Sequence, residues 1–185
     1  MIKPWKILKS EYVLHRPWLT ARKDTVQLPD GRVNDEFWVL EYPRWINVIA
    51  STTDGRYILV RQYRHGLGEV ATELCAGVVE DGEEPLDAAR RELCEETGYT
   101  GGKWSLNCIV CANPGSQNNL TYCFIAEDVT QSGERHLDAN EDLDVVIMSR
   151  DELAALLKSG TMRQALMLSS LWKYFAERYP ELVKP

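Results

Sequence analysis

The sequence lacks a long run of apolar residues. Although 44% of its 185 residues are hydrophobic, each apolar stretch stays far below the roughly 20 residues that a membrane-spanning helix needs. The basic side chains among the first ten residues are not followed by an apolar segment, so we expect neither a signal peptide nor a membrane partner. Repeats and low-complexity segments are also missing, and the composition is typical of a folded globular chain.

Positive charge is also scarce. Lysine and arginine total 21 against 28 aspartates and glutamates, which gives a formal net charge of −7. A nucleic-acid polymer as the main partner is therefore disfavoured, because its phosphate backbone requires a basic surface. A small phosphorylated substrate stays possible if a metal ion bridges the like charges.

Cysteine and histidine are present without the spacing of a zinc site. The five cysteines are odd in number, and the Cys108-x-x-Cys111 pair has no second pair to complete a tetrahedral site. We expect reduced thiols and a cytoplasmic location. The three histidines, which are His15, His65 and His136, show no metal-ligand or catalytic-triad arrangement.

The length favours one main domain with an N-terminal extension. Asp30-Gly31 is typical of a hairpin turn and lies between two strand-like segments, residues 25–28 and 37–42. We therefore predict an antiparallel strand extension over residues 1–43 and a main domain over residues 44–185.

Turn residues and periodicity predict the elements of the main domain. Strands are expected at residues 46–50, 57–63, 70–79, 104–111, 120–127 and 143–148. A helix is expected from Pro85 to Gly98, and two more close the chain on either side of Gly160. Capping boxes are predicted at Ser149 with Glu152, and at Thr161 with Gln164. The order of elements indicates an α/β fold with a mixed sheet.

Three carboxylates share one face of the first helix. Glu92, Glu95 and Glu96 lie at positions i, i+3 and i+4, where like charges repel, and near the helix C-terminus, where the macrodipole disfavours anions. A hard divalent cation such as Mg²⁺ or Mn²⁺ would make the cluster favourable. The alternative is a solvated acidic face relieved by Arg90 and Arg91.

The wider pattern favours the metal. Its fixed residues are spaced as in the Nudix box, and they are Gly77, Glu83, Arg91, Glu92, Glu95, Glu96 and Gly98. The segment resembles that box, with Tyr99 in place of the usual aliphatic residue. The resemblance implies an α/β/α sandwich and a metal-dependent hydrolase that cleaves the pyrophosphate of a nucleoside diphosphate linked to another moiety.

Segments outside the box are similar to the ADP-ribose pyrophosphatase branch of that family. They are residues 62–64, residues 73–77, residues 139–145, and Pro114, which stands fifteen residues after Tyr99. Two features depart from the branch: Cys75 replaces a proline, and the loop carries Asn113 and the Gln-Asn-Asn run at residues 117–119. These departures leave the linked group open.

The resemblance also implies roles for residues. Glu92 and Glu96 would bind the metal, Glu95 would bind it or support the ligands, and the carbonyl of Ala76 would add an oxygen. Glu96, Glu95 and Glu141 would be catalytic. Glu141 would be the general base, with Asp138 or Glu127 as substitutes.

Other residues would bind the substrate or shape the motif. Arg64 would hold a phosphate, Pro114 would mark the specificity loop, and Trp45 or Tyr42 could stack on a base. Gly77, Glu83, Arg91 and Gly98 would be structural, with Arg91 orienting the carboxylates through ion pairs.

ADP-ribose is the expected substrate, with AMP and ribose 5-phosphate as products. Another sugar nucleotide, a dinucleotide cofactor or a nucleoside triphosphate is the alternative within the family. An alternative of another class is a non-catalytic module that senses a nucleotide, although none of the box glutamates is lost. Members of the resembled branch are commonly homodimers that share N-terminal strands, and the aromatic-rich extension fits such a partner.

Overall fold

The computed structural model describes residues 1–137, 139 and 141–184. Two compact units make up the chain. The smaller unit is Met1–Pro43 with Cys111–Leu120, and the larger is Arg44–Val110 with Thr121–Pro185. Within the described ranges, every helix is too short or too polar to cross a membrane.

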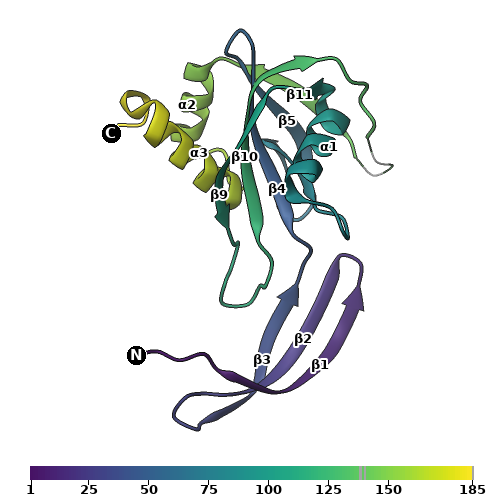
Figure 1. Ribbon diagram of the computed structural model, residues 1–185, viewed down its shortest axis with the longest axis vertical. Coiled ribbons are helices and arrows are strands. Elements are labelled where there is room, and N and C mark those ends of the chain that lie inside the picture. Colours follow the sequence, from purple (N-terminus) through teal and green to yellow (C-terminus); the bar gives the residue numbers. More distant parts are fainter. Residues whose placement is uncertain (138, 140, 185) are drawn as a thin grey trace. The chain divides into compact units, whose positions relative to one another are not determined.

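The smaller unit is an antiparallel three-stranded sheet. Its strands follow one another in the order β1 (Lys6–Arg16), β2 (Leu19–Gln27) and β3 (Val33–Glu41) (Figure 1). The amide of Gly31 donates to the carbonyl of Leu28 at 3.0 Å, and Gly31 has a φ of +89°, which only glycine adopts easily. The predicted hairpin turn is therefore confirmed.

This sheet leaves much apolar surface uncovered. Every residue of β1 is exposed. The unit's exposed large apolar side chains include Trp5, Ile7, Leu8, Tyr12, Val13, Leu14, Trp18, Leu19, Val33 and Trp38. A three-stranded sheet with so few buried residues depends on further packing for its stability.

The larger unit is built on an eight-stranded mixed sheet. Its strands are β4 (Trp45–Thr52), β5 (Tyr57–Arg64), β6 (Glu69–Glu73), β7 (Cys75–Val78), β8 (Tyr99–Thr100), β9 (Lys103–Val110), β10 (Thr121–Gln131) and β11 (Leu143–Met148). The main path runs β11-β5-β4-β10-β8, with β6 on β5, β7 on β4 and β9 on β10. Strands β4 and β10 pair in parallel, with Thr121 beside Trp45.

Helices cover both faces of this sheet. Helix α1 (Pro85–Thr97) lies on one face, and α2 (Arg150–Ser159) and α3 (Ala165–Arg178) lie on the other (Figure 1). A short 3₁₀ helix, Pro180–Leu182, follows α3. The arrangement confirms the predicted α/β/α sandwich with a mixed sheet.

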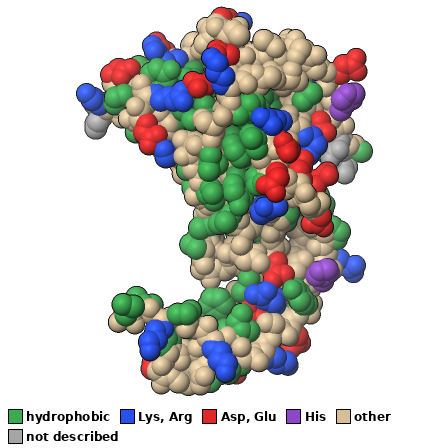
Figure 2. Space-filling view, in the orientation of Figure 1, with side chains coloured by type: hydrophobic (Ala, Val, Ile, Leu, Met, Phe, Trp, Pro, Cys, Tyr) green, Lys and Arg blue, Asp and Glu red, His purple; other side chains and the backbone are tan. Residues whose placement is uncertain are grey.

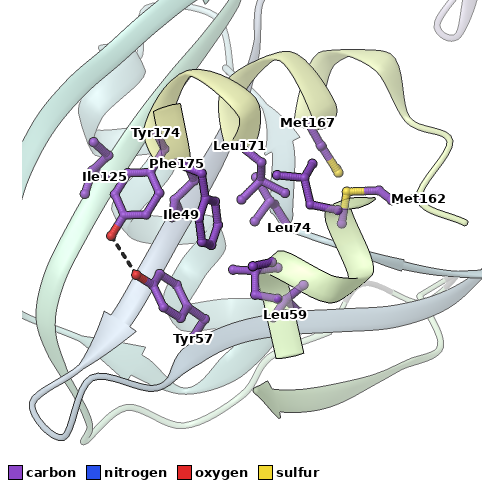
Figure 3. Close-up of a cluster of buried hydrophobic side chains, with 13 residues drawn as sticks. Ile49, Tyr57, Leu59, Leu74, Ile125, Met162, Met167, Leu171, Tyr174 and Phe175 are labelled. Atoms are coloured by element: carbon purple, nitrogen blue, oxygen red, sulfur yellow. Dashed lines mark hydrogen bonds between the residues drawn. The ribbon is translucent and has the colours of Figure 1, made fainter. Parts of the chain in front are cut away.

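Aromatic side chains join α3 to the sheet. The hydroxyls of Tyr57 and Tyr174 are 2.8 Å apart and form a buried hydrogen bond (Figure 3). Phe175 and Leu171 are fully buried beside them. Burial raises the pKa of both tyrosines, so the pair stays neutral and satisfies its own polar groups.

One of the two predicted capping boxes is wrong. The box of Ser149 with Glu152 is confirmed, because both of its hydrogen bonds are present at the start of α2. Helix α3 instead begins at Ala165, and the side chain of Gln164 caps it by accepting from the amide of Leu166 at 3.1 Å. The hydroxyl of Thr161 pairs with that of Ser159 at 2.7 Å, so it does not serve α3.

Candidate active site

Helix α1 presents the acidic cluster. Pro85 starts the helix, and Gly98 ends it with a φ of +74°, the left-handed conformation that glycine permits. Ala88, Ala89 and Leu93 are fully buried against the sheet. This apolar stripe fixes the rotation of the helix, and acidic side chains gather on the surface where α1 lies (Figure 2).

The three carboxylates of α1 have different surroundings. Only 2% of Glu96 is exposed, and its Oε2 accepts from the amide of Ala76 at 3.3 Å. The side chain of Glu92 is 12% exposed, whereas that of Glu95 is 37% exposed. Glu92 and Glu96 therefore form the inner pair, and Glu95 lies at the rim.

Strand β7 approaches α1 so closely that only glycine fits at position 77. A Cβ added to Gly77 would lie 2.0 Å from the carboxylate carbon of Glu92, well inside van der Waals contact. The backbone of β7 thus lies directly under that carboxylate. Gly77 is required here by the close approach, whereas Gly98 is required by its backbone conformation.

Arg91 connects the outer carboxylates to the loop before the helix. Its guanidinium donates to Glu83 at 3.0 Å, and to Glu92 and Glu95 at 2.9 Å each. It also donates to the carbonyl of Val78 at 3.0 Å. These bonds raise the pKa of Arg91 and lower that of Glu83. The arginine holds the cluster in place and has its donors engaged by protein groups.

Burial shifts the acidity of the inner pair. It raises the pKa of Glu92 to about 7, against the opposing effect of Arg91, and the pKa of Glu96 to about 8. The charge of Glu141 raises both values further, so this residue of the 139–145 segment lies close to the pair. Burial also raises the pKa of the neighbouring Cys75 thiol, with Glu96 adding to the effect.

Of the two substitutes for Glu141, Glu127 lies away from this cluster. Asp138 lies outside the described residues. Glu127 forms an ion pair with Arg178 and lines a separate cavity of about 510 Å³ with Tyr174. Of Glu141 and Glu127, Glu141 is the one whose charge acts on the inner pair.

A cavity of about 770 Å³ adjoins the cluster. Ala76, Gly77, Arg64 and Trp45 line it, so the backbone under the carboxylates also forms part of its wall. The predicted substrate residue Pro114 belongs to the Cys111–Leu120 loop of the smaller unit, where Asn113 accepts from the amide of Gly115 at 3.3 Å.

Arg64 is held by a buried acid. Its Nε and Nη2 donate to Oε2 of Glu73 at 2.8 and 2.6 Å. Glu73 is 3% exposed, whereas the side chain of Arg64 is 39% exposed. This pairing, which sequence reasoning missed, orients the guanidinium at the cavity. The only sign of this pairing in the sequence is Glu73 itself, an acidic residue within the mainly apolar strand segment predicted at residues 70–79.

The donor set suits a hard cation. Within the described parts of the chain, three acidic, cysteine or histidine side chains do not converge on one point as a ready metal site. The inner pair nevertheless offers buried carboxylate oxygens whose raised pKa values a divalent cation would lower. Oxygen donors of this kind fit Mg²⁺ or Mn²⁺.

The NUDIX domain family matches residues 41–171. The chain belongs to the Nudix family of hydrolases. A second match, described as a nucleoside diphosphate sugar hydrolase N-terminal domain, covers residues 5–40.

Curated relatives of this Nudix chain with pyrophosphatase names include a bacterial and a mammalian protein. The ADP-ribose pyrophosphatase of Bacillus subtilis (strain 168) is 31% identical over 161 residues, 86% of each chain. The ADP-sugar pyrophosphatase of Mus musculus is 48% identical over 135 residues, 63% of this chain and 58% of its own. The crystal structure of an ADP compounds hydrolase has the same fold, with a TM-score of 0.85 at 20% identity over 98% of this chain and 97% of that one.

Replacing Gly77 tests the close approach of β7 to α1. Gly77→Ala is expected to lower the free energy of unfolding by about 1–3 kcal/mol, because the added methyl overlaps Glu92. In the Glu92→Ala background the same change should cost less than half as much. Urea unfolding of the four proteins measures both values, and equal costs in the two backgrounds would contradict the geometry.

The raised pKa values predict a pH dependence of stability. Between about pH 5 and pH 8 the folded protein keeps protons on Glu92 and Glu96 that the unfolded chain has released. Without divalent cations, their contribution is complete below pH 4.5 and is lost as the pH rises through 7 and 8.

Thermal unfolding in EDTA checks this dependence, with Glu92→Gln/Glu96→Gln as the reference that lacks both titrations. Between about pH 5 and pH 8 the Tm of the native protein should fall by at least about 2–4 °C more than that of the variant, which corresponds to about 1 kcal/mol of stability. Addition of Mg²⁺ at pH 8 should restore the loss. Parallel pH profiles for the two proteins would refute the assignment.

Proposed function

We propose that this Nudix hydrolase converts ADP-ribose and water into AMP and ribose 5-phosphate, with Mg²⁺ or Mn²⁺ as the metal. The observation that carries the proposal is the inner pair, the buried Glu96 and the partly buried Glu92, beside a cavity of about 770 Å³ that Arg64 and Trp45 line. A nucleoside diphosphate linked to a sugar is of a suitable size for such a cavity. The pyrophosphatase names of the relatives favour the same substrate class.

The proposed site divides the work between its charged groups. A divalent cation, when bound, would neutralise the pyrophosphate and acidify the attacking water. Glu92 and Glu96, with the Ala76 carbonyl, would hold it, and Glu95 would support them from the rim. Glu141 would accept the proton of the water, since its charge acts on the inner pair.

The substrate would be positioned by groups at the cavity. Glu73 orients the Arg64 guanidinium, which would contact the phosphates. Trp45 would stack on the base. Pro114 and the loop around it belong to the smaller unit, and their part in the choice of linked group is proposed from the sequence alone. The buried charge of Glu73 leaves Arg64 with part of its positive charge compensated, which suits a reversible contact with an anion.

Turnover is the direct test. With Mg²⁺, ADP-ribose should yield AMP and ribose 5-phosphate, separated by chromatography, and Glu141→Gln should slow the reaction by at least about a hundredfold. Glu96→Gln should abolish the metal-dependent turnover. Glu127→Gln is the matched control, because that carboxylate pairs with Arg178, and its rate should stay within about twofold of the native rate.

Other results would change the assignment in defined ways. Preferred cleavage of GDP-mannose, FAD, NADH, a diadenosine polyphosphate or a dNTP would transfer the proposal to that substrate. Binding of ADP-ribose without turnover in the presence of Mg²⁺ or Mn²⁺ would support a nucleotide-sensing module instead.

We also propose that the chain forms a homodimer through the sheet of the smaller unit. The support is the exposed β1 with its apolar side chains, since such an edge favours partner contact. Light scattering should give twice the 21.1 kDa of one chain, and Ile7→Glu/Tyr12→Glu should shift it to the monomer. A native monomer would refute the proposal.

A further inference from the structure

Asn47 is a polar residue in a buried apolar strand. It lies in β4 between Ile46 and Val48, and 1% of it is exposed. Among the described residues, neither its amide nitrogen nor its amide oxygen has a hydrogen-bond partner. The Cys123 thiol beside it interacts with the amide, but a thiol is a weak partner. A buried amide in this state lowers stability, so its presence calls for a functional reason.

The cavity of the candidate site supplies that reason. Asn47 lines it, together with Trp45 and Thr121. Because side chains alternate along a strand, Trp45 and Asn47 face the same side of β4. The register places Asn47 beside Ala76 of β7, whose amide binds Glu96. An aromatic ring, the Asn47 amide and the Arg64 guanidinium therefore lie around one cavity, and the backbone of Ala76 and Gly77 connects its wall to the acidic cluster.

The remaining walls of the cavity are of mixed character. Its apolar groups include Ile46, Leu166 and Met167, and its polar side chains include Arg64, His65, Glu73 and Arg163. Beside Asn47 the neighbouring side chain on the same side of β4 is the Trp45 ring. A nucleobase has flat apolar faces and a polar edge, which matches an aromatic ring next to a deep amide.

The amide further distinguishes between bases. It presents one donor and one acceptor side by side, and adenine offers the complementary pair through its amino group and N7. Hypoxanthine and guanine present two acceptors along this edge, O6 and N7, so the amide oxygen would be left without a donor.

We propose that Asn47 recognises the polar edge of adenine while the base lies against Trp45, which makes Asn47 a specificity-determining residue. This inference rests on the proposed function, because it assigns the nucleotide part of the substrate to this cavity. The sugar-linked phosphates would then extend from the base toward Arg64 and the acidic cluster.

Binding of AMP and IMP in EDTA tests the assignment without turnover. Calorimetry on the native protein should show AMP binding between about fivefold and a hundredfold more tightly than IMP. Asn47→Leu, of similar size and apolar, should bind both nucleotides with the weaker IMP affinity. Its Tm should equal or exceed that of the native protein, since the unpaired amide is removed.

Asn107→Leu is the matched control. Its amide donates to the carbonyl and the hydroxyl of Ser170 at 2.9 and 3.0 Å, so the variant should lose stability but keep the native preference for AMP. If Asn47→Leu fails to fold, Asn47→Ala replaces it in the same measurement.

Two results would overturn the inference: equal affinities of the native protein for AMP and IMP, or an undiminished preference in the Asn47 variants. Either result, together with hydrolysis of ADP-ribose by the native protein, would leave the proposed function standing. A preference for AMP that depends on Asn47 would support the inference even if ADP-ribose were not cleaved.

Discussion

The contact between the backbone of β7 and helix α1 is the constraint on which the site depends. Because residue 77 has no side chain, the Glu92 carboxylate lies against the strand. The same approach brings the Ala76 amide to Glu96 and the Val78 carbonyl to Arg91. Three consecutive residues of one strand thus orient three side chains of one helix.

This arrangement concentrates negative charge where burial opposes it. Arg91 compensates Glu83, Glu92 and Glu95, but Glu96 is left with an amide and a thiol as neighbours. The protein therefore maintains groups that weaken its own fold, as sites that bind a cation often do. Asn47 has the same character on the other side of the sheet, where its buried amide has only a weak thiol partner among the residues that the structure describes.

Local patterns predicted the elements and the acidic cluster, because turns, caps and helical spacing act over a few residues. Local patterns were enough to predict the hairpin at Gly31, the limits of α1 and the cap at Ser149. They were not enough to predict the pairing of Arg64 with Glu73, since it depends on the register of β5 with β6. The capping box predicted at Thr161 was wrong because a second capping residue lies nearby. Helix α3 begins at Ala165, and the side chain of Gln164 caps it.

The parallel pairing of β4 with β10 joins residues that are far apart in the chain, such as Trp45 and Thr121. Contacts of this kind are slow to form, because a long loop must close before they contribute energy. Strand β4 supplies Trp45 and Asn47 to the cavity, and β10 supplies Thr121. The wall of the cavity is therefore complete only when these two strands have met, whereas the limits of α1 depend on residues close together in the sequence.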